Sequence, residues 1–501
     1  MNSKAILKLI PKNVYKTLSI LEERGFEAYL VGGCVRDLIL QRAPNDWDIT
    51  TNANPEEIQS CFEKTVYENN FGTVAVVYED EEDISCRVIE ITPYRIDGIY
   101  TDGRRPDSVS FGKSLEEDLA RRDFRINAIA LDVKGILHDP FNGQEDIKNR
   151  LIQTVGNPKD RFNEDVLRVF RAVRFSAQLG FLVSYETKEA ITDLVLHKNL
   201  TVSHEISLRN VSPERIRDEF LKLIDAPFAK EALIFSRETG ILDEIIPEFK
   251  DSFECEQNGD HIYDVWNHLI NSLEHATKKE YPLFIKISAL FHDIGKPATR
   301  RYDSSKKDYT FYGHEVVGAQ MTKKILTRLK FPREISEKIV KLVRWHMFFS
   351  DTDQISISAV RRMINNVGHD LIWSLMDVRI CDRIGMGRPK EDPYRLRKYH
   401  AMIEQALRDP ISVKQLAING DIMIAELGMK PGKRMGWILQ SLLEEVLEDP
   451  EKNTRKYLEE YIQELATLSD EELKKKAEKG KEKQQEAEKD ELKKIRRKHK
   501  V

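Results

Sequence analysis

Long hydrophobic runs are absent from this sequence. No apolar stretch approaches the ~20 residues that a helix needs to cross a bilayer, so we expect no membrane partner. The first residues, MNSKAILKLIPKNVYKTL, have the period of an amphipathic helix and lack the apolar core of a signal peptide. The five cysteines are scattered without CxxC spacing, which favours neither a disulfide framework nor a zinc knuckle. A reducing, cytoplasmic setting fits best.

Charge of one sign is not in large excess. The net charge of −5 gives no global signature of nucleic-acid binding, so any such binding needs a local basic surface. Arginines cluster along two stretches, but arginines on helix surfaces are common, and these clusters alone decide nothing. They are Arg161, Arg168, Arg171 and Arg174, and then Arg209, Arg215 and Arg217.

What is present is a long chain with two kinds of pattern. Its 501 residues exceed the size at which one hydrophobic core keeps growing, so about two to four domains are expected. Up to about residue 140, short β-branched runs such as 72–79 and 86–92 mix with helical patterns. From about residue 150 helical periodicity replaces the strand pattern, as in 164–180, where Gly180 supplies the stop. The predicted fold class is therefore α+β, a mixed head followed by a helical body.

The stretch LVGGCVRD places two glycines directly after a predicted strand. Gly32 and Gly33 have no Cβ, so their backbone N–H groups can approach a phosphate closely. Arg36 follows within one helical turn and can supply charge to the same phosphates.

Two carboxylates, Asp46 and Asp48, follow downstream in NDWDIT. In an extended strand residues i and i+2 point to the same face, so both carboxylates would converge on one point. Such a pair suits Mg²⁺, and two metals can clamp the attacking and leaving oxygens of a phosphoryl transfer. A polar surface loop is the simpler alternative for this motif taken alone.

The stretch DLARRDFRINAIALD (118–132) places Arg122 and Asp123 before an apolar, strand-like run. An aspartate that accepts from a ribose hydroxyl and an arginine that contacts phosphates are natural companions of a nucleotide. A charged loop before a core strand explains the same residues equally well.

The stretch NEDVLRVFRAVRFSAQLGF (163–181) places Glu164, Asp165 and Arg168 near the start of a helix. Asp165 and Arg168 are three residues apart and share a face, where they offer an acceptor and donors to the Watson–Crick edge of a base. A capped, salt-bridged helix is the common alternative.

Five motifs together resemble one family. LVGGCVRDLIL…NDWDIT, RRDFRINAIALD, HDPFNGQEDI, EDVLRVFRAVRFSAQLGF and SPERIRDEFLKLI occur in the order typical of class II tRNA nucleotidyltransferases, the bacterial-type CCA-adding enzymes, which are relatives of bacterial poly(A) polymerases. The resemblance covers roughly residues 20–250. It implies a polymerase β-like nucleotidyltransferase head that adds CTP and ATP to the 3′ end of tRNA with Mg²⁺. It also implies a hinge at 139–147 and a bracing helix at 214–220.

The resemblance also implies roles for single residues. Asp46 and Asp48 match the catalytic metal-binding pair, Asp123 the ribose-binding residue, and Asp165 with Arg168 the amino-acid template that pairs with C or A. The implied nucleotide-binding set is Gly32, Gly33, Arg36, Arg122, Asp123, Asn127, Glu164, Asp165, Arg168 and Arg171. Arg174 is expected to contact RNA.

The segment from residue 91 to residue 124 matches the flexible loop that accompanies A addition in this family, which disfavours a CC-only enzyme. Addition of A alone, or a poly(A) polymerase activity, stays open as an alternative.

A second constellation lies in the helical body. His268, the adjacent pair His292-Asp293 in FHDIGK, and Asp382 offer nitrogen and oxygen ligands that suit a divalent metal of unknown identity. His314 and His346 are possible further members. Imidazoles and carboxylates with open positions can activate water for phosphate-ester hydrolysis.

This series resembles the HD phosphohydrolase superfamily, and in some bacterial CCA-adding enzymes a fused HD domain is similar to a phosphatase and 2′,3′-cyclic phosphodiesterase. The alternatives are a helical body that only grips tRNA, or an RNA phosphohydrolase whose head only binds RNA ends. His261 and His275 are interpreted as bystanders on charged faces.

Residues 418–458 resemble the C-terminal segment of the same family. Pro431 and Gly432 open a predicted helix beside Lys430, Lys433 and Arg434, which form a candidate RNA-phosphate docking point. The predicted boundaries are 1–148 for the head, 149–250 for the neck, 255–390 for the HD domain, 391–465 for the C-terminal helical region and 466–501 for a charged tail that is solvated or disordered. The sequence does not indicate an oligomeric state.

Overall fold

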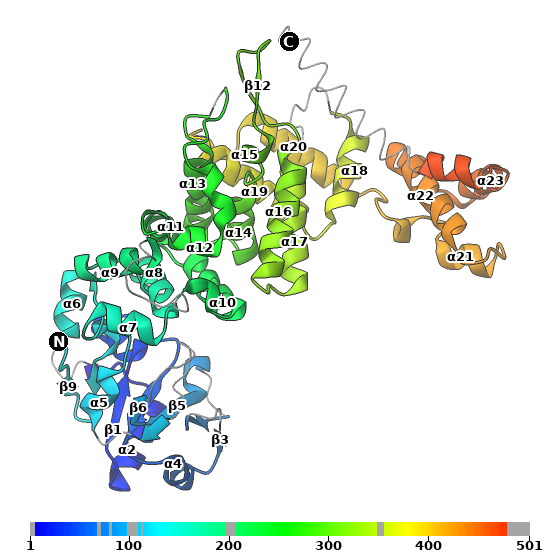
Figure 1. The fold of residues 1–501 in the computed structure, drawn as a ribbon. Coiled ribbons are helices and arrows are strands. Elements are labelled where there is room, and N and C mark those ends of the chain that lie inside the picture. The colour runs from blue at the N-terminus through cyan, green and yellow to red at the C-terminus, as the bar shows by residue number, and fades with distance from the viewer. Residues whose placement is uncertain are drawn as a thin grey trace. The chain divides into compact units, whose positions relative to one another are not determined.

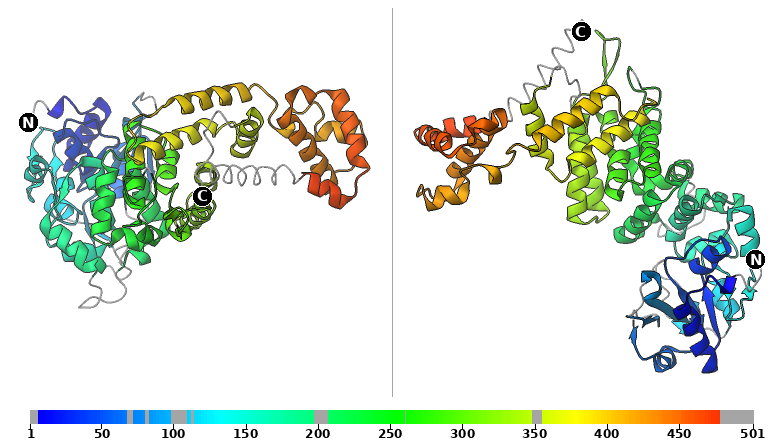
Figure 2. Two further views of the ribbon diagram at one scale, coloured as in Figure 1. Left: turned by 90° about the horizontal axis from the view of Figure 1, so that it is seen from above. Right: turned by 180° about the vertical axis from the view of Figure 1, so that it is seen from behind.

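The computed structural model describes residues 6–67, 72–79, 83–97, 109–111, 114–196, 207–259, 261–347 and 355–477 (Figures 1 and 2). The chain divides into two compact units, Met1–Pro247 and Glu248–Val501. The predicted head and neck fall in the first unit, and the predicted HD domain and C-terminal region fall in the second. Residues 98–108 and 112–113 of the predicted loop and 478–501 of the predicted tail lie outside the described residues. Within the described part of the chain, no helix combines the length and apolarity needed to span a bilayer.

A seven-stranded mixed sheet forms the centre of the first unit, in the order β3-β4-β5-β2-β1-β8-β9. β2 and β5 run parallel, and the other neighbours are antiparallel. The predicted strands after residue 28 and in 72–79 and 86–92 are present. The strands are β1 Ala28–Val31, β2 Asp48–Thr51, β3 Thr65–Tyr67, β4 Val74–Val77, β5 Val88–Pro93, β8 Ala130–Leu131 and β9 Leu137–His138.

Helices make up most of the rest of the first unit. The amphipathic start becomes α2, and the predicted helix over 164–180 becomes α8, which ends where Gly180 adopts φ +70°. A Cβ on Gly180 would lie 2.7 Å from the Phe228 ring, so the stop also requires space that only glycine leaves. The helices are α2 Lys12–Glu23, α3 Gly33–Ile39, α4 Pro55–Cys61, α5 Leu115–Ala120, α6 Gly143–Asn149, α7 Pro158–Glu164, α8 Leu167–Leu179, α9 Tyr185–Leu196, α10 Pro213–Asp225, α11 Ala229–Glu238 and α12 Ile241–Ile245, with a 3₁₀ turn η2 at Arg125–Asn127.

The second unit is built from helices. Leu375, Leu442 and Leu458 are completely buried in a core that continues from the HD region into the C-terminal helices. The helices are α13 Val265–Lys278, α14 Leu283–Phe291, α15 Lys296–Thr299, α16 His314–Arg328, α17 Arg333–Trp345, α18 Ile357–Val367, α19 Ile372–Gly385, α20 Tyr394–Ala406, α21 Gly420–Ala425, α22 Lys433–Glu448 and α23 Arg455–Ala466.

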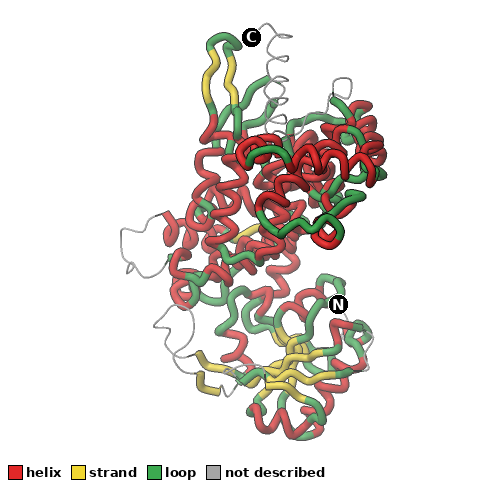
Figure 3. The backbone as a smooth tube through the Cα atoms, turned by 90° about the vertical axis from the view of Figure 1, so that its right-hand side faces the viewer, coloured by secondary structure: helices red, strands yellow, loops and turns green. Residues whose placement is uncertain are grey.

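The expectation that strands disappear after about residue 150 is wrong. Two β-ribbons interrupt the helices, and Figure 3 draws the second of them in yellow, projecting from the helices of its own unit. Each strand has only two or three residues, which is too short for a period-2 pattern to stand out from a charged loop. The short strands are β6 Arg95–Asp97 and β7 Val109–Phe111 in the head, β10 Leu151–Ile152 and β11 Leu182–Val183 in the neck, and β12 Arg301–Asp303 and β13 Asp308–Thr310 in the second unit.

Candidate functional sites

The carboxylates of the head lie at the start of β2. Asp48 is the first residue of the strand, Asp46 lies in the bend before it, and Trp47 between them is buried. Burial, and then the negative charge of Asp46, raises the pKa of Asp48 to about 6, while Arg122 acts in the opposite direction. Like charges that raise a carboxyl pKa in this way form a site that a divalent cation stabilises. The donor set therefore fits Mg²⁺.

A third carboxylate, Glu90, adds to this cluster. β5 runs parallel to β2 and pairs Asp48 with Glu90, and the charge of Glu90 also raises the pKa of Asp48. Sequence reasoning missed Glu90. The available signal was its exposed place between Ile89 and Ile91, which are buried, but the pairing with β2 is a matter of sheet register.

Gly32 joins the glycine motif to the carboxylates. Its backbone adopts φ +79°, and a Cβ at this position would lie 3.1 Å from Nη1 of Arg122 and 3.5 Å from Oδ2 of Asp48. Only glycine fits comfortably in this left-handed conformation and this space. The structure thus brings together Gly32, Asp48 and Arg122, which come from three separate sequence stretches.

Arg36 and Asn127 extend the contact between these stretches. Arg36 is buried, donates to both carboxylate oxygens of Asp37 and donates from Nη1 to Oδ1 of Asn127 at 2.8 Å. Asn127 in turn donates to Asp123. Asp37 therefore neutralises part of the Arg36 charge that was predicted to face the triphosphate.

Asp123 is buried and held by a charged partner from the neck. Its carboxylate accepts from the backbone N–H of Phe124 and from Nε and Nη2 of Arg171, the latter two at 2.8 and 2.6 Å. Burial disfavours the charged carboxylate, but the charge and hydrogen bonds of Arg171 outweigh it and lower the pKa of Asp123 to about 2. Asp123 is thus an ionised acceptor fixed between the head and α8.

The predicted base-reading residues lie at the junction of α7 and α8. Oδ2 of Asp165 accepts from Arg215 on α10 at 2.7 Å, and its Oδ1 accepts from the N–H of Leu167 at 3.0 Å. Arg168 donates to the carbonyl oxygens of Arg161 and Arg121, each at 3.1 Å, and pairs with Glu164. Both side chains have fixed orientations, and α10 braces the junction in the manner expected for residues 214–220.

Arg174 does not lie where an RNA contact needs it. Only 7% of the residue is exposed, and its guanidinium pairs with Glu219 on α10, donates to Gln178 and stacks 3.8 Å from the Phe175 ring centroid. Its charge is neutralised inside the unit, so the structure assigns it to the packing of α8 on α10, against the expected RNA contact. Sequence reasoning had no signal for Glu219 as its partner.

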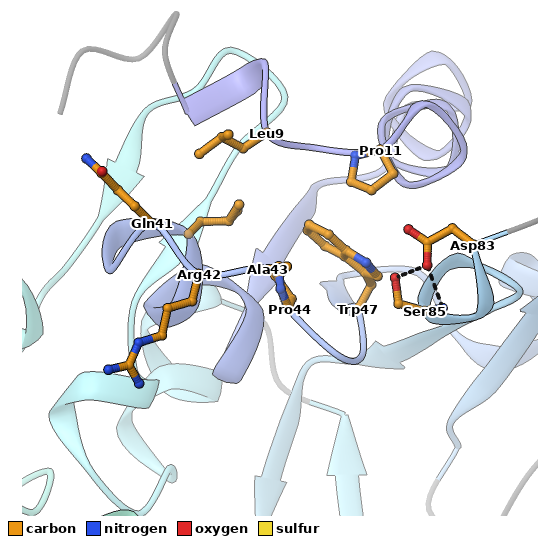
Figure 4. A pocket seen from close by; sticks show the side chains of 10 residues that line it. Leu9, Pro11, Gln41, Arg42, Ala43, Pro44, Trp47, Asp83 and Ser85 are labelled. Atoms are coloured by element: carbon orange, nitrogen blue, oxygen red, sulfur yellow. Dashed lines mark hydrogen bonds between the residues drawn. The ribbon is translucent and has the colours of Figure 1, made fainter. Parts of the chain in front are cut away.

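A hollow of about 410 Å³ lies elsewhere on the head (Figure 4). Trp47 lines it together with Leu9, Pro11 and Arg42. Because consecutive strand residues point to opposite sides, Trp47 faces away from the side of Asp46 and Asp48. The hollow is therefore separate from the carboxylate cluster.

The second unit contains a buried cluster of six histidine and aspartate ligands. Among the described residues, two groups can each hold a metal ion, and both include Asp293. The first group joins His268 on α13, His292 and Asp293 after α14, and Asp382 on α19, and the second joins Asp293 to His314 on α16 and His346 after α17. The whole predicted series is thus brought together by five helices.

Asp293 lies between the two groups. Its Oδ2 is 3.1 Å from Nε2 of His268 and 3.3 Å from Nε2 of His292. Its Oδ1 is 3.0 Å from Nε2 of His314 and 3.3 Å from Nε2 of His346. One carboxylate with one oxygen toward each group is suited to bridge two metal ions.

The histidine rings are oriented for metal binding. Nδ1 of His292, His314 and His346 lies 2.8, 2.7 and 2.7 Å from the carbonyl oxygens of Ala289, Phe311 and Val343, respectively. A carbonyl accepts a proton from Nδ1, which leaves the lone pair of Nε2 pointing into the cluster. Nε2 of His268 and His292 lie only 2.9 Å apart, and a shared cation satisfies two such facing nitrogens.

Nearby cations keep the carboxylates of this cluster ionised. Burial raises the pKa of Asp293, but Lys296, whose Nζ lies 2.6 Å from Oδ2, and the adjacent His292 hold it well below its usual range. Arg379 has the same effect on the pKa of Asp382. The donor set of imidazoles and ionised carboxylates fits a transition metal in each group.

The interpretation of His261 as a bystander needs correction. Its ring centroid lies 5.2 Å from that of His268, and its buried Nδ1 has no hydrogen-bond partner. Burial, and then the charge of Lys296, lowers the pKa of His261 to about 3. His275 lies two turns further along α13, with its Nε2 3.9 Å from a carboxylate oxygen of Glu391, and is no member of either metal group.

The predicted RNA-docking cations near α22 divide into two classes. Lys430 and Lys433 are exposed. Arg434 instead donates to the carbonyl oxygens of Ala466 and Leu468, at 3.0 and 2.7 Å, and pairs with Asp470. Arg434 therefore caps the end of α23 and holds it against α22.

Comparisons with known proteins agree with this division of the chain. A family model of the poly A polymerase head domain matches residues 28–153, and one of the HD domain matches residues 259–387. A third, described as "Probable RNA and SrmB- binding site of polymerase A", matches residues 180–253.

Relatives that resemble this chain in sequence and in fold are CCA-adding enzymes. The enzyme of Lactobacillus helveticus is 46% identical over 233 residues, 46% of this chain and 54% of that protein. The enzyme of Geobacillus thermodenitrificans is 48% identical over 222 residues, 44% of this chain and 51% of that protein. The aligned region thus spans about half the length of these relatives. The crystal structure of the Bacillus stearothermophilus CCA-adding enzyme in complex with CTP has 26% identity and a TM-score of 0.63, covering 91% of this chain and 99% of that one.

Proposed function

We propose, from the kinship of this chain with the bacterial-type CCA-adding enzymes and from its HD domain, that it adds CCA to the 3′ end of tRNA from CTP and ATP. The observation that carries this proposal is the junction at Gly32, where Asp48 and Arg122 meet from separate motifs with only the space of a missing Cβ between them. The resemblance to an enzyme solved with CTP supports the choice of nucleotide. The cytoplasm, where no cysteine needs a disulfide partner, is the proposed location.

The residues of the first unit divide the work of the proposed reaction. Asp46 and Asp48 would hold Mg²⁺, with Glu90 beside them. When bound, the metal lowers the pKa of the attacking RNA hydroxyl and neutralises charge on the departing pyrophosphate. Arg122 lies against Gly32, where it can pair with the triphosphate, and this placement orients the α-phosphate for in-line attack.

Base selection falls to the neck. Cytosine and adenine both present an amino donor beside a ring-nitrogen acceptor, which matches a carboxylate next to a guanidinium. Arg215 and the N–H of Leu167 fix the carboxylate of Asp165, and two main-chain carbonyls fix Arg168. A base with another pattern leaves these buried polar groups unpaired, which is how a site without a nucleic-acid template rejects it.

A primer-extension assay tests this function. We expect tRNA transcripts that end before CCA, after C or after CC to be extended to the same CCA end with Mg²⁺, CTP and ATP. Extension of only the CC transcript, by one A, would reduce the activity to A addition. No extension of any transcript would contradict the proposal.

The HD centre supports a second proposed activity, the hydrolysis of a phosphate ester. The observation that carries it is Asp293, whose two oxygens each face a separate pair of histidines. Divalent metals bound there would supply water activation and charge neutralisation. Lys296, which contacts Asp293, and His261, with its unpaired Nδ1, are placed at this centre to bind phosphate oxygens.

Hydrolysis of 2′,3′-cyclic AMP by the full chain, with Mn²⁺, Co²⁺ or Ni²⁺ supplied, tests the second activity. We expect His314→Ala to abolish it. His275→Ala is the matched control, because His275 is a buried histidine of the same unit outside both metal groups. Equal activity of the two variants would contradict the assignment.

A further inference from the structure

The β12–β13 hairpin occupies a distinctive place in the second unit. In the chain it follows α15, directly after the His292-Asp293 pair, and ends four residues before His314. It therefore connects a ligand of the first metal group to a ligand of the second. Figures 1 and 3 show the hairpin projecting from the helices of this unit.

One face of the hairpin carries a ladder of planar side chains. Tyr302 and Tyr309 are directly opposite each other in the antiparallel register, with ring centroids 5.5 Å apart and an interplanar angle of 74°. The guanidinium carbon of Arg300 lies 3.6 Å from the centroid of the Tyr309 ring. Tyr302, at the outer end, is 61% exposed and offers its ring to a partner.

The hairpin is also rich in cations. Arg300, Arg301, Lys306 and Lys307 outnumber the two carboxylates, Asp303 and Asp308. Both carboxylates are engaged locally: Asp303 accepts from the N–H of Ser305 in its own turn, and Asp308 accepts from the N–H of Gly259. The net charge offered to a ligand is therefore positive.

A chain of contacts fixes the hairpin to the metal centre. Asn258 donates from Nδ2 to the carbonyl oxygen of Tyr309 at 2.7 Å. The preceding residue, Gln257, accepts from Nζ of Lys296 at 2.6 Å, and the same Nζ lies 2.6 Å from Oδ2 of Asp293. The planar ladder is thus held at a defined position relative to the ligand that both metal groups share.

Exposed aromatic rings interleaved with cations form the surface that binds unpaired nucleic acid, because every base has a face that can stack and every nucleotide carries a phosphate. We propose that this hairpin is the platform for the unpaired 3′ end of an RNA strand whose terminal phosphate enters the HD centre. This inference rests on the proposed hydrolase function and specifies its substrate as an RNA end. The base stacks on Tyr302, and the arginines and lysines of the hairpin pair with the backbone phosphates.

The test compares two substrates on the metal-loaded full chain. One is 2′,3′-cyclic AMP, which is too small to reach from the centre to Tyr302, and the other is a short single-stranded oligoribonucleotide with a 2′,3′-cyclic phosphate end. We expect Tyr302→Ala to raise KM for the oligonucleotide about tenfold, the loss of one stacked base, without changing its kcat or the hydrolysis of cyclic AMP. Tyr302→Trp should restore the KM.

Tyr394→Ala is the matched control, because Tyr394 on α20 is a similarly exposed tyrosine (67%) outside the hairpin. An unchanged KM in Tyr302→Ala, or an equal rise in Tyr394→Ala, would overturn the inference. If the wild-type chain hydrolyses neither substrate, the hydrolase proposal fails, and fluorescence anisotropy of the labelled oligonucleotide then decides. Weaker binding by Tyr302→Ala alone supports the platform, and equal binding by wild type and both variants refutes it.

Discussion

In the first unit the carboxylates Asp46 and Asp48 lie at the start of a strand, and Asp46 is exposed to solvent. In the second unit all six ligands of the HD centre are buried, and His268 and His292 have no exposed surface. The open site leaves most coordination positions to substrate phosphates, which is the usual arrangement for Mg²⁺. The closed site supplies nitrogen and oxygen ligands from the protein itself, which favours a resident transition metal. One chain thus presents two solutions to holding a metal next to a phosphate.

The difference is sharpest at Asp293, which has no counterpart in the head because it contacts both histidine groups of its centre. We expect Asp293→Ala to lose both metal ions and His314→Ala to lose one, measured by metal analysis of the purified protein. Hydrolysis of cyclic AMP should fall more than about 100-fold in each, because even loss of an outer partner of a metal ligand costs ~10–100-fold. Two metal ions retained by Asp293→Ala would contradict the bridging role.

Metal removal and return should separate the two sites by their ligand chemistry. After treatment with EDTA and desalting, Mg²⁺ alone should restore nucleotide addition, since the head offers only carboxylates. Hydrolysis should return only with Mn²⁺, Co²⁺ or Ni²⁺, because imidazole nitrogens favour those ions. Restoration of hydrolysis by Mg²⁺ alone would show that the two centres do not differ as their ligands indicate.

Asp123 tests whether the open site is nonetheless built on a rigid frame. Its pKa of about 2 lies below the ordinary value of 3.8, so the ion pair with Arg171 stabilises the fold above pH 3.8 and this contribution is lost as the pH falls toward 2. We expect Asp123→Asn to lower the free energy of unfolding by about 2 kcal/mol at neutral pH. Denaturant titrations should show this difference shrinking between pH 4 and 2, whereas Asp218→Asn, at an exposed aspartate of α10, should cost little at any pH. A pH-independent loss in Asp123→Asn would count against the ion pair.

The smallest effects are expected at α22, where one arginine is structural and two lysines are exposed. Lys430→Ala with Lys433→Ala should raise KM for tRNA a few-fold and lower the salt dependence of binding by about one unit per lost phosphate contact, without changing Tm. Arg434→Ala should lower stability by about 1 kcal/mol, because it removes hydrogen bonds to the end of α23. Thermal melts and filter-binding titrations of both variants check this division, and the reverse pattern would refute it.

Sequence reasoning succeeded where the chemistry lies in one short stretch. The strand before Gly32, the carboxylate pair Asp46 and Asp48, and the stop of α8 at Gly180 all follow from local patterns, and the His-Asp series of the body led to its metal groups. Local patterns failed where two distant strands or helices had to meet. The pairing of Glu90 with Asp48 depends on the parallel register of β5 with β2, and the burial of Arg174 depends on Glu219 from another helix.

The β12–β13 hairpin and the position of His261 escaped prediction for the same reason. Three-residue strands give too few alternations to identify, and a histidine seven residues before a metal ligand has no defined place until the intervening turn is known. The division of labour at Asp293 likewise required coordinates, because the sequence does not state which oxygen faces which histidine.

The most direct test of the account is to measure both reactions on the same preparations of Asp48→Ala and Asp293→Ala. We predict that Asp48→Ala loses CCA addition to tRNA by at least about 10³-fold, as expected for a residue at a reaction centre, and keeps hydrolysis of 2′,3′-cyclic AMP. Asp293→Ala should show the opposite pattern. Loss of both reactions in either folded variant would contradict the central claim that this chain carries two independent metal-dependent phosphate chemistries.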